Sequence, residues 1–199
     1  MDTQEEELDD DYTDATDDNL LGIFDKAELN AQEAKGILRA EEYILNLELP
    51  LTINYFLLLN IHQEAFKHLY EWAGKYRTSN PTAGTFLPTS FRYVPNELYQ
   101  FMEEVNYRYT NVKEKEDLVK CLAYAHHGIV KIHPFTNGNG RSARLFTDLL
   151  AYSKGYRSVE LYHRDAGEPR KKYLQAIRLA DKHDYSLLED MIRTQLCEL

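Results

Sequence analysis

The sequence has few of the features that mark a secreted or membrane protein. Its 199 residues include only two cysteines, Cys121 and Cys197, which lie in helical patterns far apart in the chain. Such cysteines are typical of reduced core residues rather than of a disulfide. No run of about eighteen apolar residues could span a membrane, and the N-terminus has neither the basic nor the apolar region of a secretory signal. We therefore expect a cytoplasmic protein with no membrane contact.

The chain also lacks a surplus of basic residues. Its net charge is −10, but ten of its 33 acidic residues lie between residues 2 and 18, where no basic residue occurs. The remaining 23 acidic residues balance the 23 lysines and arginines. A block of like charges with few apolar residues does not fold, so residues 1–18 are predicted to be a disordered acidic tail, either solvated or bound to a basic partner. The neutral remainder disfavours nucleic-acid binding.

The sequence is rich in helical periodicity. Hydrophobic residues make up 43% of the chain and aromatic residues 12%, which is enough for the core of one domain. Asp25 is the predicted N-cap of the first helix, Thr52 or Asn54 begins the second, and Gly74 ends it. The expected helices cover approximately residues 26–45, 54–74, 96–110, 115–131, 140–155, 168–182 and 185–197.

Residues 78–95 interrupt this periodicity. Prolines and glycine punctuate the segment, while Thr85–Leu87 and Phe91–Val94 favour extended backbone. We expect a loop or a short β-hairpin here. The predicted fold class is therefore an all-α, single-domain helical bundle with one short β-hairpin.

The densest chemistry lies in the twelve residues HPFTNGNGRSAR, from His133 to Arg144. Pro134 ends the preceding helix, and the next begins near Gly140. The segment therefore sits at a helix N-terminus, where unpaired N–H groups and the helix dipole favour an anion. Gly138 and Gly140 allow the backbone to approach a phosphate closely.

Side chains in the same segment can hold a polyphosphate and move a proton. Arg141 and Arg144 are three residues apart on one helical face, which places both guanidinium groups along one side of a phosphate chain. Asn139 could donate a side-chain hydrogen bond there. An unperturbed imidazole titrates near pH 6.5, so His133 can deprotonate a hydroxyl that attacks phosphorus. The glycine spacing differs from a Walker A loop.

A zinc site built on His126, His127 and His133 is a competing interpretation. Pro134 breaks the helix at that point, and no cysteine or carboxylate completes a zinc set at the usual spacing. We therefore interpret His126 and His127 as core or capping residues.

The twelve residues resemble the signature of the Fic (Fido) family, HxFx(D/E)GNGRxxR. Segment 72–77, Trp-Ala-Gly-Lys-Tyr-Arg, resembles the part of the family that precedes a flap hairpin, and the likeness covers roughly residues 55–195. The asparagine form of the signature and segment 27–30 are most similar to the small Fic proteins labelled "mobile mystery protein B". The matching positions are His133, Phe135, Gly138, Asn139, Gly140, Arg141 and Arg144 in the signature and Tyr173, Ala176, Ala180, Asp181 and Asp184 near the C-terminus.

This resemblance implies a protein adenylyltransferase, which transfers AMP from ATP to a Ser, Thr or Tyr hydroxyl of a target protein. It implies His133 as general base and Tyr173 in an adenine pocket. A flap over residues 84–94 would pair with the target backbone. The resemblance also implies phosphate binding by Gly138, Asn139, Gly140, Arg141 and Arg144. It divides the chain into the tail at 1–18, a helical segment at 19–54 and a catalytic domain at 55–199.

The sequence departs from the signature at the acidic residue that would hold Mg²⁺ (or Mn²⁺), because Asn137 stands there. An amide oxygen can still bind a hard cation, without negative charge. Transfer of another nucleotide, a phosphoryl group or phosphocholine therefore remains open, as does a non-catalytic module that binds nucleotide or protein. The family's inhibitory motif, (S/T)xxxE(G/N), is matched only in part, at residues 194–199. We interpret that segment as a helix end, so inhibition would come from a partner protein or be missing.

Overall fold

Seven α-helices make up the part of the chain that the structure, a computed structural model, describes: residues 18–81, 88–161 and 167–199. This confirms the predicted all-α class. The helices are α1 (Lys26–Leu45), α2 (Tyr55–Phe66), α3 (Val94–Thr110), α4 (Lys115–Ile132), α5 (Asn139–Ser153), α6 (Glu168–Ala180) and α7 (Ser186–Gln195).

Local capping explains where several helices begin. The Asp25 carboxylate accepts the backbone N–H of Glu28 at 2.8 Å, and the Asn54 side chain accepts that of Leu57 at 3.1 Å. Both residues satisfy N–H groups that have no acceptor within the helix. The predicted starts of α1 and α2 are thus confirmed, with Asn54 rather than Thr52 as the second N-cap.

The second helix is shorter than predicted. It ends at Phe66, and the chain continues in turns to Gly74 instead of as helix through Trp72. Trp72 stacks on Tyr70 at a centroid distance of 4.3 Å, and its indole N–H donates to Asp18. These tertiary contacts fold residues 67–74 back along α2. Helical periodicity in the sequence does not reveal them, so the predicted helix was too long.

The predicted extended segment at Phe91–Val94 is wrong. Residues 91–93 form a turn and Val94 begins α3, with Pro95 in the first helical turn, where its missing N–H costs nothing. The Asn80 side chain accepts the N–H of Phe91 at 2.8 Å, which supports the turn. The other arm of the expected hairpin falls largely on residues 82–87, which lie outside the described residues. Among the described residues, the β structure is a single isolated bridge between Tyr156 and Glu198.

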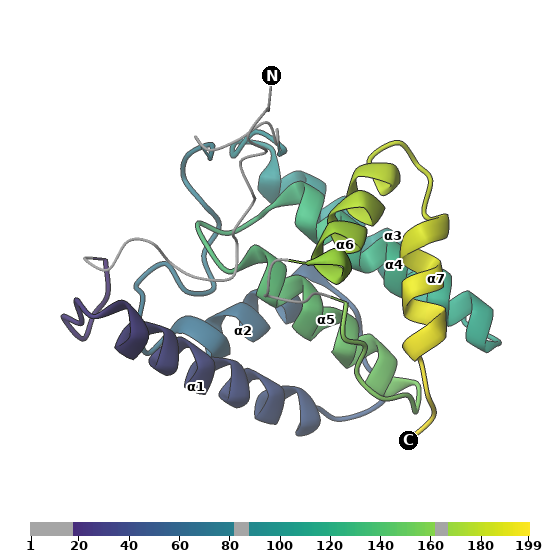
Figure 1. The fold of residues 1–199 in the computed structure, drawn as a ribbon, viewed down its shortest axis with the longest axis horizontal. Helices are drawn as coiled ribbons and strands as arrows, with labels where there is room; N and C mark the ends of the chain where they lie inside the picture. The colour runs from purple at the N-terminus through teal and green to yellow at the C-terminus, as the bar shows by residue number, and fades with distance from the viewer. Residues whose placement is uncertain (1–17, 82–87, 162–166) are drawn as a thin grey trace.

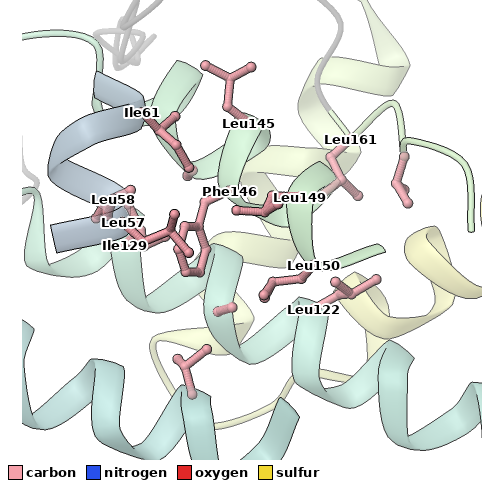
Figure 2. Close-up of a cluster of buried hydrophobic side chains, with 14 of the residues drawn as sticks. Leu57, Leu58, Ile61, Leu122, Ile129, Leu145, Phe146, Leu149, Leu150 and Leu161 are labelled. Atoms are coloured by element: carbon pink, nitrogen blue, oxygen red, sulfur yellow. The ribbon is translucent and has the colours of Figure 1, made fainter. Parts of the chain in front are cut away.

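The centre of the molecule is α5, which packs against α1, α2 and α4 (Figure 1). Its apolar residues converge with those of α2 and α4 in the buried cluster that Figure 2 shows. The helix that begins at the predicted anion site is therefore also the helix most deeply embedded in the core. The labelled members of this cluster are Leu57, Leu58, Ile61, Leu122, Ile129, Leu145, Phe146, Leu149, Leu150 and Leu161.

Both cysteines are free: Cys121 is buried, and burial raises its thiol pKa to about 12, whereas Cys197 is exposed beyond the end of α7. Residues 1–17 of the predicted acidic tail lie outside the described residues. Among the described residues, none of the helices combines the length and apolarity that a membrane span needs.

Candidate functional site

His133 occupies the junction between α4 and residues 134–138, which connect α4 to α5 and are called the signature loop below. It is the C-cap of α4 in the left-handed region (φ 53, ψ 61), and its N–H donates to Ile129 at 3.0 Å. Pro134 follows and cannot continue the helix. Only 8% of His133 is exposed. The prediction that the helix ends just before the twelve-residue motif is confirmed.

Gly138 makes the sharp turn into α5. Its φ of +75 is the left-handed conformation that glycine adopts without strain. A Cβ atom there would lie 2.6 Å from the Phe66 ring, so the turn also requires glycine for space. The N–H groups in the first turn that follows, from Asn139 to Arg141, have no acceptor within the helix and lie at the positive end of its dipole. This geometry is compatible with an anion, and anion binding by the loop stays a prediction.

The predicted role of the Asn139 side chain is wrong. The residue is fully buried, and its Oδ1 accepts the N–H of Phe135 at 2.8 Å while its Nδ2 donates to the carbonyl of Phe135 at 3.0 Å. The side chain therefore braces the signature loop from within instead of donating to a ligand. Only its backbone N–H is placed for phosphate binding.

Arg141 is buried and engaged with three protein groups. Its Nη1 donates to the Glu33 carboxylate of α1 at 2.8 Å, and its Nη2 donates to Asn137 Oδ1 at 3.3 Å. The guanidinium carbon lies 4.6 Å from the centroid of the Phe66 ring, within range of a cation–π contact. Glu33, itself 1% exposed, also accepts from the Tyr70 hydroxyl at 2.8 Å. A phosphate would have to compete with Glu33 for Arg141.

Arg141 and Arg144 line one cavity of about 840 Å³ between α1, α5 and residues 158–161. The two arginines are therefore brought together as predicted, whereas His133 and the glycine turn lie outside this cavity. Asp148 also lines this cavity and accepts the N–H of Val159 at 2.9 Å. Burial raises the pKa of Asp148 to about 6, against the effect of that hydrogen bond.

Asn137 does not provide a suitable site for a resident Mg²⁺. Its Oδ1 accepts from the N–H of Gly138 and from Arg141, so the amide oxygen already faces two donors. Across the described part of the chain, no group of three or more His, Cys, Asp or Glu side chains could hold a metal ion. Hard cations bind several oxygen ligands, usually including carboxylates. Asn137 as a ligand for a cation that arrives with a nucleotide stays a prediction.

Two residues, His62 and Arg77, support the loop without a role predicted from the sequence, where Arg77 was noted only as the end of segment 72–77. His62 of α2 is fully buried, stacks on Phe135 with ring centroids 3.6 Å apart, and contacts the Asn137 carbonyl at 3.1 Å. Burial is the main cause that lowers the His62 pKa to about 3. The sequence gives little sign of this role, because His62 contacts the Asn137 carbonyl across 75 positions of the chain.

The second supporting residue, Arg77, joins the signature loop to the segment before α3. Its Nε donates to the His133 carbonyl at 2.6 Å, and its Nη2 donates to the carbonyls of Thr89 and, at 3.5 Å, Ile132. The guanidinium thus caps the carbonyl end of α4, where a cation is favoured. Burial lowers the pKa of Arg77.

The remaining candidate residues lie in the core. His126 contacts Thr147 Oγ1 at 3.2 Å and the Tyr173 hydroxyl at 2.9 Å. His127 contacts Tyr185 and Asp181, so both histidines are core residues, as predicted. Tyr173 is 5% exposed and its hydroxyl contacts His126, and its place in an adenine pocket stays a prediction.

Solved structures share this fold. The BepC protein of Bartonella tribocorum, with bound AMPPNP, aligns with a TM-score of 0.73 at 18% identity, covering 94% of this chain and 96% of that one. Fic-1 of Caenorhabditis elegans aligns with a TM-score of 0.68 at 25% identity, covering 87% of this chain and 50% of that one.

Sequence relatives match over part of their length. "Protein adenylyltransferase fic-1" of Caenorhabditis elegans is 34% identical over 112 residues, which is 56% of this chain and 21% of the relative. "Protein adenylyltransferase Fic" of Drosophila melanogaster is 29% identical over 130 residues, which is 64% of this chain and 25% of the relative. The chain thus spans a quarter or less of these relatives. The model of the Fic/DOC family matches residues 52–151, half of the chain, and the chain belongs to that family.

Proposed function

We propose that this chain transfers AMP from ATP to a Ser, Thr or Tyr hydroxyl of a target protein. The observation that carries the proposal is that one short loop joins His133 to the first turn of α5 and its two arginines. Membership of the Fic/DOC family and the names of its relatives, protein adenylyltransferases, support AMP as the transferred group.

In the proposed reaction, His133 accepts the proton of the target hydroxyl. The hydroxyl oxygen forms a bond to the α-phosphorus of ATP, and the bond from that phosphorus to the oxygen bridging the α- and β-phosphates breaks. Pyrophosphate leaves with the electron pair of that bond. Such a transfer depends mainly on positioning and on stabilisation of negative charge.

The binding roles follow from where the groups lie. The loop from Gly138 to Gly140 binds the phosphates that flank the reacting bond, through the backbone N–H groups of Asn139 and Gly140, and Arg141 and Arg144 bind the terminal phosphates. A divalent cation would supply further charge neutralisation when it enters with the nucleotide. The residues around Asn137 do not fit a resident Mg²⁺, because its amide oxygen already faces two donors.

Glu33 has a regulatory consequence at this site. The family resemblance implies an inhibitory glutamate paired with the second arginine of the signature, but here a glutamate of α1 pairs with the first, Arg141. Phosphate binding at Arg141 requires that this ion pair open. This contact would restrain activity within the chain itself, in addition to any inhibitory partner protein. The target protein is proposed to dock on residues 84–94, as the resemblance implies.

Two observations favour the alternative of a binding module without turnover: Arg141 is held by Glu33, and Asn137 bears no charge. The two functions are separated by incubation with cell lysate and labelled ATP, GTP, UTP or CDP-choline in parallel. Label on protein that depends on ATP supports AMP transfer, and label from another donor identifies a different group. Nucleotide binding with no label from any donor would favour the module.

A further inference from the structure

The tautomer of His62 is determined by its two backbone contacts. Nδ1 lies 2.8 Å from the backbone nitrogen of Gly74, and Nε2 lies 3.1 Å from the carbonyl oxygen of Asn137. An amide N–H can only donate and a carbonyl can only accept. Both contacts are satisfied only when Nδ1 is unprotonated and Nε2 carries the proton. The ring is therefore neutral, and it donates to the signature loop.

Packing fixes the direction of that donor. The His62 ring lies nearly parallel to Phe135, at 8°, and 4.9 Å from the Phe66 ring. Gly74, at a φ of +73, brings its N–H close to α2, and a Cβ there would lie 2.8 Å from Gln63 Cβ. The ring is thus held on its faces by aromatic side chains and at its edge by a glycine turn.

The Asn137 carbonyl that accepts from His62 belongs to the signature loop. The Asn137 carbonyl and the Gly138 N–H form one planar trans peptide unit, so they point in opposite directions. Holding the carbonyl on Nε2 turns the Gly138 N–H away from His62, and that N–H donates to Asn137 Oδ1. Gly138 tolerates backbone conformations closed to other residues, so this peptide unit depends on two restraints: His62 on its carbonyl side and Asn137 Oδ1 on its N–H side.

We propose that His62 is a positioning residue that fixes the orientation of the peptide unit between Asn137 and Gly138 and thereby the backbone turn that leads into the first turn of α5. Its consequence for transfer rests on the proposed function. His62 itself touches neither nucleotide nor target, because it lies fully buried behind the loop. Direct inspection of its wild-type tautomer and a pair of substitutions test this role.

The substitutions separate the two ring nitrogens. His62→Gln places an amide N–H near the position of Nε2 and keeps the donor to Asn137, whereas His62→Asn places an amide oxygen near Nδ1 and keeps only the acceptor for Gly74. Each variant loses one hydrogen bond, so both are expected to lower the Tm by a similar amount. We expect His62→Asn to weaken ATP affinity and slow transfer by about 10–100-fold, and His62→Gln by about threefold or less.

His127 provides the matched control. It is also a buried histidine with a contact at each ring nitrogen, to Tyr185 and Asp181, and it does not contact the loop. The variants His127→Gln and His127→Asn should lower the Tm and leave ATP affinity unchanged. Equal losses of ATP affinity in His62→Gln and His62→Asn would overturn the proposal.

A readout without nucleotide separates this inference from the proposed function. Hydrogen exchange at the Gly138 amide should be about tenfold faster in His62→Asn than in His62→Gln, even if the wild type transfers nothing. Equal exchange would overturn the proposal whatever the activity. If neither variant folds, ¹⁵N NMR of the wild-type ring decides: a proton on Nε2 supports the assignment, and a proton on Nδ1 contradicts it.

Discussion

The ion pair between Glu33 and Arg141 makes opposite predictions for stability and for nucleotide binding. Glu33→Gln keeps the shape of the side chain and an acceptor for Tyr70, but removes the charge that balances buried Arg141. Removing one partner of a buried ion pair costs about 3–5 kcal/mol. Because the amide oxygen still accepts a hydrogen bond, we expect the lower end, about 3 kcal/mol. For a chain of this size this lowers the Tm by roughly 6–12 °C.

The same substitution should strengthen ATP binding. In the wild type a phosphate must displace Glu33 from Arg141, whereas in Glu33→Gln the guanidinium is held only by neutral groups. A charge-assisted hydrogen bond contributes about 1.5–3 kcal/mol, so we expect the Kd for ATP to fall by about 10–100-fold. Saturating ATP should then restore several degrees of the lost Tm by linkage.

Thermal melts with and without ATP, together with calorimetric titration, measure both effects. Glu41→Gln is the control, since Glu41 lies eight residues beyond Glu33 on α1 and lines the same cavity. It should change the Kd by about twofold or less. The reasoning is refuted if Glu33→Gln keeps both the wild-type Tm and the wild-type Kd.

Three further substitutions test neighbouring features. Burial raises the pKa of Asp148 to about 6, so the charge of Asp148 destabilises the fold increasingly above about pH 4 and fully above pH 6. Asp148→Asn should therefore raise the Tm at pH 7.5, and this gain should vanish near pH 4. Thermal melts at several pH values measure both effects. Gly138→Ala should lower the free energy of unfolding in urea by about 2–4 kcal/mol, because it adds a clash with Phe66 to the strain of a left-handed backbone. Gly155 is the control, since it is also left-handed but lies in open space, and Gly155→Ala should cost only about 1–2 kcal/mol. Asn137→Asp should tighten Mn²⁺ binding in the presence of ATP, measured by EPR, and no change would mean that Asn137 is not a ligand.

Local rules predicted the parts of this fold that depend on neighbouring residues. Asp25 and Asn54 cap their helices, and Pro134 ends α4 before His133, because each effect acts within one helical turn. The end of α2 was mispredicted because the stacking of Trp72 on Tyr70 and its bond to Asp18 overrode a continuing periodicity.

The site shows the same division. Gly138 and the paired arginines were predictable from spacing along one helix turn. The hydrogen bonds of the Asn139 side chain to the backbone of Phe135 were not predictable, because an asparagine that binds a ligand and one that binds the loop itself look the same in the sequence. Glu33 meets Arg141 across 108 positions, and His62 meets Asn137 across 75. Such pairs arise only when α1, α2 and α5 pack together.

Transfer of label from ATP by the wild type and by His133→Ala tests the central claim most directly. ATP labelled at the α-phosphorus and ATP labelled at the γ-phosphorus are compared in parallel with cell lysate, and nucleotide binding is measured for both proteins. We predict label on protein from the α-position only, its loss in His133→Ala by a factor of about 100 or more, and unchanged ATP binding. Label from the γ-position, or undiminished transfer by His133→Ala, would contradict the claim.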